Sequence, residues 1–203
     1  MTTGSHNIGI GCLAFVGNYS TGSYNIALGN EAAKSLTSGY QNVFIGCKAG
    51  YYSLGNAYSV FIGNSAGYHN DSGNDNVFIG NYAGCGSNVG TINAGCNAAI
   101  GYGAGRNLTT GTFNTFMGKD AGMCISTGTE NIAFGCSALK GSATAGNNTG
   151  TNNIALGQNA GCTITSGSCN IAIGKAAGVG QTGADYNIFL GNCTGAAAGS
   201  RYA

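Results

Sequence analysis

The stretch Asn42-Val43-Phe44-Ile45-Gly46 decides the fold, because close variants of it recur along the chain in eleven copies. Every copy opens with Asn, except the one that opens at Ser59, and every copy closes with Gly. Most closing glycines follow one another after 17 residues, and the exceptions are steps of 18, 21 and 22. These glycines are Gly11, Gly29, Gly46, Gly63, Gly80, Gly101, Gly118, Gly135, Gly157, Gly174 and Gly191. Such a period is typical of a solenoid, in which each unit buries its apolar side only against its neighbours.

The repeats run from about residue 7 to residue 195, so we interpret 1–203 as a single domain with a short tail at 196–203. The 39 glycines fall on the period and are separated by Ile, Val, Leu and Phe, a pattern that disordered chains lack. A collagen helix is excluded, because it needs Gly at every third position and abundant Pro, and this chain has no Pro.

Charge and hydropathy exclude several classes of partner. The net charge is +1 and the seven Lys and Arg residues are scattered, whereas nucleic-acid binding needs a clustered basic face. No segment approaches the ~18 apolar residues of a membrane span, and the N-terminus lacks the features of a secretory signal. We therefore expect no nucleic acid and no membrane insertion, and we expect the chain either to assemble in a cytoplasm or to be a piece of something longer.

The nine cysteines do not follow a disulfide or metal pattern. Equivalent cysteines, such as Cys12 and Cys47, never fall in adjacent repeats, and no C-x-x-C spacing occurs. We expect most of them to be reduced, small apolar residues, and we predict no metal and no cofactor.

One repeat predicts one coil with a short strand and several corners. The opening phrase is rich in β-branched and aromatic residues and is bounded by Gly. An Ala-Gly pair three residues later, as in Ala49-Gly50, indicates a tight inner corner. The predicted fold is all-β, a repetitive parallel β-solenoid (β-roll or β-helix) of about eleven 17-residue coils, in a homotrimeric fibre. Stacked at ~4.8 Å, the coils form a rod of ~50 Å.

The opening Asn column predicts a ladder of side-chain amides, because identical polar residues at strand spacing can each bond the next. An alternative is that this Asn only forms a turn before the strand. The ladder residues are Asn7, Asn25, Asn42, Asn76, Asn97, Asn114, Asn131, Asn153, Asn170 and Asn187.

The middle residue of each strand is never polar. With the flanking pair, such as Val43 and Ile45, assigned to the coil interior, the middle residue is expected to face outward. Strands with two apolar faces are normally covered on both, so a second copy of the chain is predicted to cover this column. The predicted oligomer interface comprises Phe44, Phe61, Phe78, Phe116 and Phe189. The alternative is a thin coil whose interior holds the middle residues instead.

Candidate ligand contacts come from loops and tyrosines. Two insertions, 85–96 and 140–152, are expected to form surface loops, which are often binding sites. Exposed aromatic rings can stack on sugars, and they can equally cap an apolar core. The residues predicted as receptor contacts are Tyr51, Tyr52, Tyr68 and Tyr82. Catalysis is not expected: the carboxyl pairs Asp71/Asp75 and Asp120/Glu130 fall in turns, where acids are normally solvated.

The repeats resemble those of bacteriophage tail-fibre and related adhesin proteins, as in Asn114-Thr115-Phe116-Met117-Gly118 and in residues 131–139. The chain is also similar, more loosely, to head domains of trimeric autotransporter adhesins. The resemblance covers about residues 3–195 and implies a non-enzymatic trimeric shaft or tip in a virion. It also implies two kinds of partner: a host-surface glycan or protein receptor, and other fibre or virion proteins. The family's C-terminal chaperone domain and anchor segments are not found in this sequence. The alternatives are a structural subunit of an extracellular filament or capsid decoration fibre, a bacterial trimeric surface adhesin, and an ice-binding solenoid, for which the Thr/Ser-Gly corners are too irregular.

Overall fold

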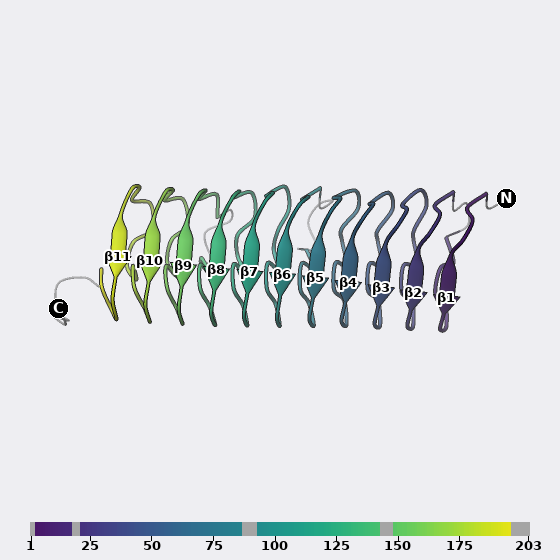
Figure 1. The fold of residues 1–203 in the computed structure, drawn as a ribbon, viewed down its shortest axis with the longest axis horizontal. Helices are drawn as coiled ribbons and strands as arrows, with labels where there is room; N and C mark the ends of the chain where they lie inside the picture. The colour runs from purple at the N-terminus through teal and green to yellow at the C-terminus, as the bar shows by residue number, and fades with distance from the viewer. Residues whose placement is uncertain (1–2, 18–20, 87–92, 143–147, 196–203) are drawn as a thin grey trace.

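The structure is a computed structural model that describes residues 3–17, 21–86, 93–142 and 148–195. These residues form a rod of stacked coils with one three-residue strand in each coil (Figure 1). The strands are β1 (Ile8–Ile10), β2 (Ile26–Leu28), β3 (Val43–Ile45), β4 (Val60–Ile62), β5 (Val77–Ile79), β6 (Ala98–Ile100), β7 (Thr115–Met117), β8 (Ile132–Phe134), β9 (Ile154–Leu156), β10 (Ile171–Ile173) and β11 (Ile188–Leu190). We number each coil after the strand that begins it.

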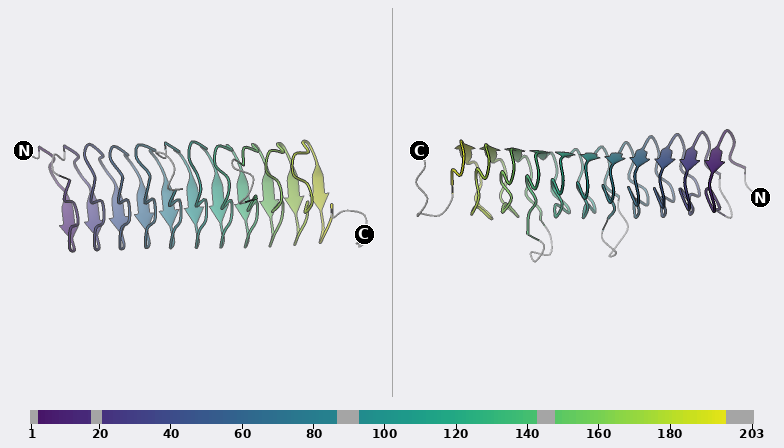
Figure 2. Two further views of the ribbon diagram at one scale, coloured as in Figure 1. Left: turned by 180° about the vertical axis from the view of Figure 1, so that it is seen from behind. Right: turned by 90° about the horizontal axis from the view of Figure 1, so that it is seen from below.

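The strands form one parallel sheet in chain order. Each residue of a strand pairs with its equivalent in the next coil, as in Val43 with Val60 and Phe44 with Phe61. Seen from below, the strands lie in a row along one side of the rod, with the turns on the other (Figure 2, right). The predicted all-β parallel solenoid is therefore confirmed.

The predicted orientation of the strands is wrong. Phe44, Phe61, Phe78 and Phe116 are fully buried inside their own coils, and Phe189 of the last coil packs partly against the same core. The flanking residues, such as Val43 and Ile45, point outward and are only half-buried. The physical reason is the alternation of side chains: Asn42 and Phe44 lie two residues apart and share a face. Because the Asn side chain turns inward, the middle residue must turn inward as well.

The core has a nearly constant cross-section that is filled in two ways. In coil 3 the ring of Phe44 fills the space beside Gly50, where an added Cβ would lie 2.3 Å from the ring. The small Ser53 also borders this space, since its hydroxyl would lie 2.9 Å from the same Cβ. In coil 2 the smaller Ala27 is combined with the buried Ala33 and Leu36. A large residue in the strand is thus compensated by small residues in the turn, which keeps neighbouring coils superimposable.

The Asn column forms the predicted ladder. Asn114 donates from Nδ2 to Oδ1 of Asn97 at 3.0 Å and to the Gly128 carbonyl at 2.9 Å. Its own Oδ1 accepts from the backbone N and from Nδ2 of Asn131, at 3.0 and 3.1 Å. Ser59 keeps the backbone bonds on both sides but interrupts the amide-to-amide link, since its hydroxyl donates to the Ala57 carbonyl. The Asn114 side chain therefore links its own strand to the preceding coil, to the following coil and to the turn at Gly128.

Replacement of Asn114 by alanine is expected to lower the free energy of unfolding by about 2–4 kcal/mol, because it leaves buried donors of Asn131 and the Gly128 carbonyl without partners. The matched control is Asn81→Ala, at an exposed position outside the ladder, which we expect to change stability by less than about 0.5 kcal/mol. Urea unfolding followed by far-UV circular dichroism measures both. Equal effects of the two substitutions would contradict a stabilising role of the ladder.

Candidate binding surfaces

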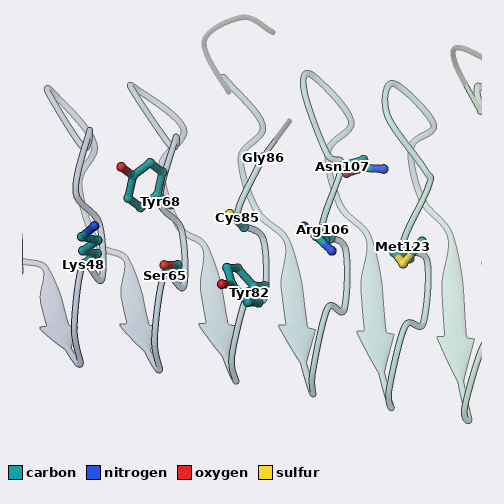
Figure 3. A pocket seen from close by; sticks show the side chains of 9 residues that line it. All are labelled: Lys48, Ser65, Tyr68, Tyr82, Cys85, Gly86, Arg106, Asn107 and Met123. Carbon is teal, nitrogen blue, oxygen red and sulfur yellow. The ribbon is translucent and has the colours of Figure 1, made fainter. Parts of the chain in front are cut away.

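A hollow of about 560 Å³ lies on the side of the rod, against the turns that follow β3 to β7 (Figure 3). Its wall is supplied by five successive coils, from Lys48 in coil 3 to Met123 in coil 7. The hollow exists because small residues interrupt columns of larger ones. Ser65 lies between Lys48 and Tyr82 in one column, and Gly86 precedes Asn107 in another.

An aromatic cluster borders this hollow. The rings of Tyr51 and Tyr68 stack across adjacent coils, with centroids 5.0 Å apart and an interplanar angle of 19°. Tyr52 stacks in the same way on His69, at 5.2 Å. Burial, together with the neighbouring Tyr52 and Tyr51, raises the pKa of the Tyr68 hydroxyl, so the ring stays neutral at ordinary pH. These ring contacts join the three tyrosines and His69 into one aromatic surface.

Tyr82 lies on the other side of the hollow from Tyr68 and contacts a cation. The Arg106 guanidinium lies 5.2 Å from the centre of the Tyr82 ring, which is a cation–π distance. Tyr102 of the next coil meets the Tyr82 ring edge-on at 6.3 Å. These contacts place a positive charge and an aromatic ring side by side at the mouth of the hollow.

The charges near the hollow are unbalanced. In the described part of the chain both ion pairs use Glu31, which lies 2.6 Å from the Lys34 ammonium and 3.8 Å from that of Lys48. The bond to Lys34 lowers the pKa of the Glu31 carboxyl. Arg106 is exposed and pairs with no carboxylate among the described residues. The wall of the hollow carries Lys48 and Arg106 and no acidic residue among those described, so Arg106 is its unpaired positive charge.

The outer face of the sheet is a second candidate surface. It consists of the first and third residue of each strand, and of these 22 side chains only Thr115 is polar. The face is half-buried along the rod and more open at the ends, where Ile10 is 64% and Ile188 is 68% exposed. Continuous apolar strips of this kind mark interaction surfaces.

The remaining chemistry-bearing groups do not converge. All nine cysteines are free thiols, and burial raises the pKa of the Cys85, Cys124 and Cys162 thiols. The described residues contain no group of three His, Cys, Asp or Glu side chains that could hold a metal ion. They also contain no helix that could cross a membrane.

The structure brings the four predicted tyrosines to one side of the rod, with Tyr68 and Tyr82 lining the hollow and Tyr51 and Tyr52 beside it. Whether they contact a receptor stays a prediction. Sequence reasoning missed Lys48, Arg106 and Asn107 as residues of the hollow. The period offered a signal, because Lys48 shares its position in the repeat with Tyr82, and Arg106 shares its position with Tyr68. Residues 87–92 and 143–147 of the two predicted insertion loops, and the predicted tail at 196–203, lie outside the described residues.

Comparison with known proteins adds no relative: no family model, curated protein or solved structure matches the chain.

Proposed function

We propose that this chain is a non-enzymatic, rigid fibre segment, a tail-fibre or spike component of a virion, that self-associates through its sheet and binds a host-surface molecule on its side. The observation that carries the proposal is the division of the rod into two surfaces. One is a sheet face on which Thr115 is the single polar side chain among the outward strand residues, and the other bears the aromatic and cationic hollow. The resemblance of the repeats to phage fibre sequences supports the viral assignment.

The resemblance to trimeric fibre proteins supports a homotrimer, and the apolar face of the sheet supports self-association. It runs the length of the rod, roughly 50 Å for eleven strands at ~4.8 Å spacing. A sheet with apolar residues on both faces is normally covered on both, and the coil itself covers only the inner one. A second copy of the same chain offers a face of the same length, spacing and chemistry, so copies can align along the rod axis.

Light scattering over a concentration series tests this proposal. We expect a constant mass three times that of the 20.0 kDa chain. We expect Ile62→Lys, which places a charge in the middle of the outer face, to give a monomer, because burying an unpaired charge costs several kcal/mol. The control is Leu54→Lys, which changes an exposed apolar residue outside the sheet and is expected to leave the mass unchanged. A monomeric unmodified chain would overturn the self-association part of the proposal.

A structural filament subunit is the second candidate. Among the described residues β1 and β11 each pair with a single strand, so both ends of the sheet present unpaired backbone groups. Such edges can template growth by strand addition. A mass that climbs steadily with concentration favours this candidate over a closed trimer.

A further inference from the structure

We propose that the hollow between Tyr68 and Tyr82 binds an anionic oligosaccharide, extended along the rod, with Lys48 and Arg106 contacting negative groups at its two ends. This inference rests on the proposed attachment function and names the chemical class of its ligand. Four observations support it, and they concern size, ring geometry, charge and hydrogen bonding.

The hollow has the size and shape for a short chain of sugars. Its volume of about 560 Å³ is within the usual range of small-molecule sites. It is elongated along the rod axis, because its wall comes from five coils in succession (Figure 3). Lys48 and Arg106 lie three coils apart, which is about 14 Å at the spacing of stacked strands. One small anion cannot reach both cations, whereas an oligomer with repeated charges can.

The rings are held in place before a ligand arrives. Tyr68 is stacked on Tyr51 and meets Tyr52 edge-on at 5.4 Å. Tyr82 contacts Arg106 and Tyr102, both from the next coil. Little side-chain freedom is therefore left to lose on binding, which favours affinity. Rigid, half-exposed tyrosines offer an apolar ring to a sugar face and a hydroxyl to its oxygens.

The charges select an anion. Glu31 is bonded mainly to Lys34, at 2.6 Å, and only loosely to Lys48, at 3.8 Å. The Arg106 guanidinium has its donors directed to no carboxylate of the described residues, and such donors can bond a carboxylate or sulfate in pairs. No described acidic residue lines the wall, and the nearest carboxylate to Lys48, that of Glu31, is engaged mainly by Lys34.

Polar groups near the two cations can bond hydroxyls. The Ser65 hydroxyl donates to the neighbouring Asn64 side chain at 3.2 Å and can still accept. The backbone N–H of Asn107 donates to the Met123 carbonyl at 3.0 Å, whereas its side-chain amide, which lines the hollow, has no hydrogen bond to a described residue and so has its donors and acceptor available. A wall that combines aromatic, polar and cationic groups fits a saccharide better than a purely apolar ligand.

Isothermal titration calorimetry with defined probes tests the inference. The probes are a hexamer of galacturonic acid, a sulfated disaccharide-repeat hexamer, neutral maltohexaose and a single-stranded DNA 12-mer. We expect one or both anionic hexamers to bind, with maltohexaose at least tenfold weaker. Arg106→Gln is expected to weaken binding about tenfold or more, while Lys175→Gln, which removes an exposed cation from coil 10, leaves it unchanged.

A second variant fills the hollow without removing a charge. Ser65→Tyr places a ring in a column that already carries Tyr82 one coil away, so the fold is expected to tolerate it while binding is lost. Circular dichroism of each variant checks that the fold is retained. The proposal is overturned if no saccharide binds, if neutral and anionic hexamers bind equally, if folded S65Y binds normally, or if DNA binds more tightly than either anionic hexamer. These outcomes are independent of the mass by light scattering, so the ligand inference can fail while the fibre proposal stands.

Discussion

Gly63→Ala is expected to lower the free energy of unfolding by roughly 3–5 kcal/mol, through backbone strain and a steric clash. Gly63 closes the opening phrase of coil 4 with φ +137°, a backbone conformation that residues with a Cβ rarely adopt. An added Cβ would lie 2.4 Å from the carbonyl oxygen of Gly80, which belongs to the backbone of the next coil. Neither atom can move away without breaking the register of the sheet.

The matched control is Gly55→Ala in the preceding coil. There the nearest atom to an added Cβ is the Ser38 hydroxyl, at 3.3 Å, and a side chain of this kind can rotate away. We expect a change of less than about 1 kcal/mol. Urea denaturation of both variants gives the comparison. Similar midpoints for the two alanine variants would show that close packing of coils at the closing glycines does not limit stability.

Phe61→Ala is the second substitution with a large expected effect, a loss of about 3–5 kcal/mol, because it opens a cavity in a fully buried site. The Phe61 ring lies between Phe44, at 5.5 Å, and Phe78, at 5.1 Å, so its removal affects the cores of three coils. The flanking Val60 is half-buried on the outer face, and Val60→Ala is expected to cost about 1 kcal/mol or less.

Amide hydrogen exchange adds a spatial test of the same substitution. In a solenoid each coil contacts only its neighbours, so the loss of protection is expected to be largest at β3, β4 and β5 and small at β9 and β10. A larger effect of Val60→Ala than of Phe61→Ala would instead indicate that the flanking residues of the strand face the coil interior, as expected from the sequence alone.

The sequence was sufficient for the architecture because the period repeats the same physical demand in every coil. A closing Gly, an inner Ala and an opening Asn each have one role, and eleven copies make the pattern unmistakable. The orientation of the strand needed one more step. Asn42 and Phe44 share a face by simple alternation, so an inward ladder and an outward Phe column are incompatible.

Other features could not be predicted from local preference. The residue before each opening Asn or Ser has φ between 56° and 62° in all eleven coils, although none is glycine. Bulky residues such as Tyr58 and Phe113 normally avoid this conformation, and here the bonds to adjacent coils impose it. The hollow was also hidden, because it arises from the absence of large side chains at Ser65 and Gly86 and not from any motif.

The identical register of neighbouring coils has a consequence for the length of the molecule. Any coil can be joined to any other through the same strand contacts, so the length of the rod can change in steps of one coil, about 4.8 Å each. Removal of residues 59–75, one period of 17, leaves Asn76 to follow Tyr58 and aligns Val77 with Val43. Unequal recombination between repeats would therefore shorten or extend such a rod by whole coils, while the remaining coils keep their register.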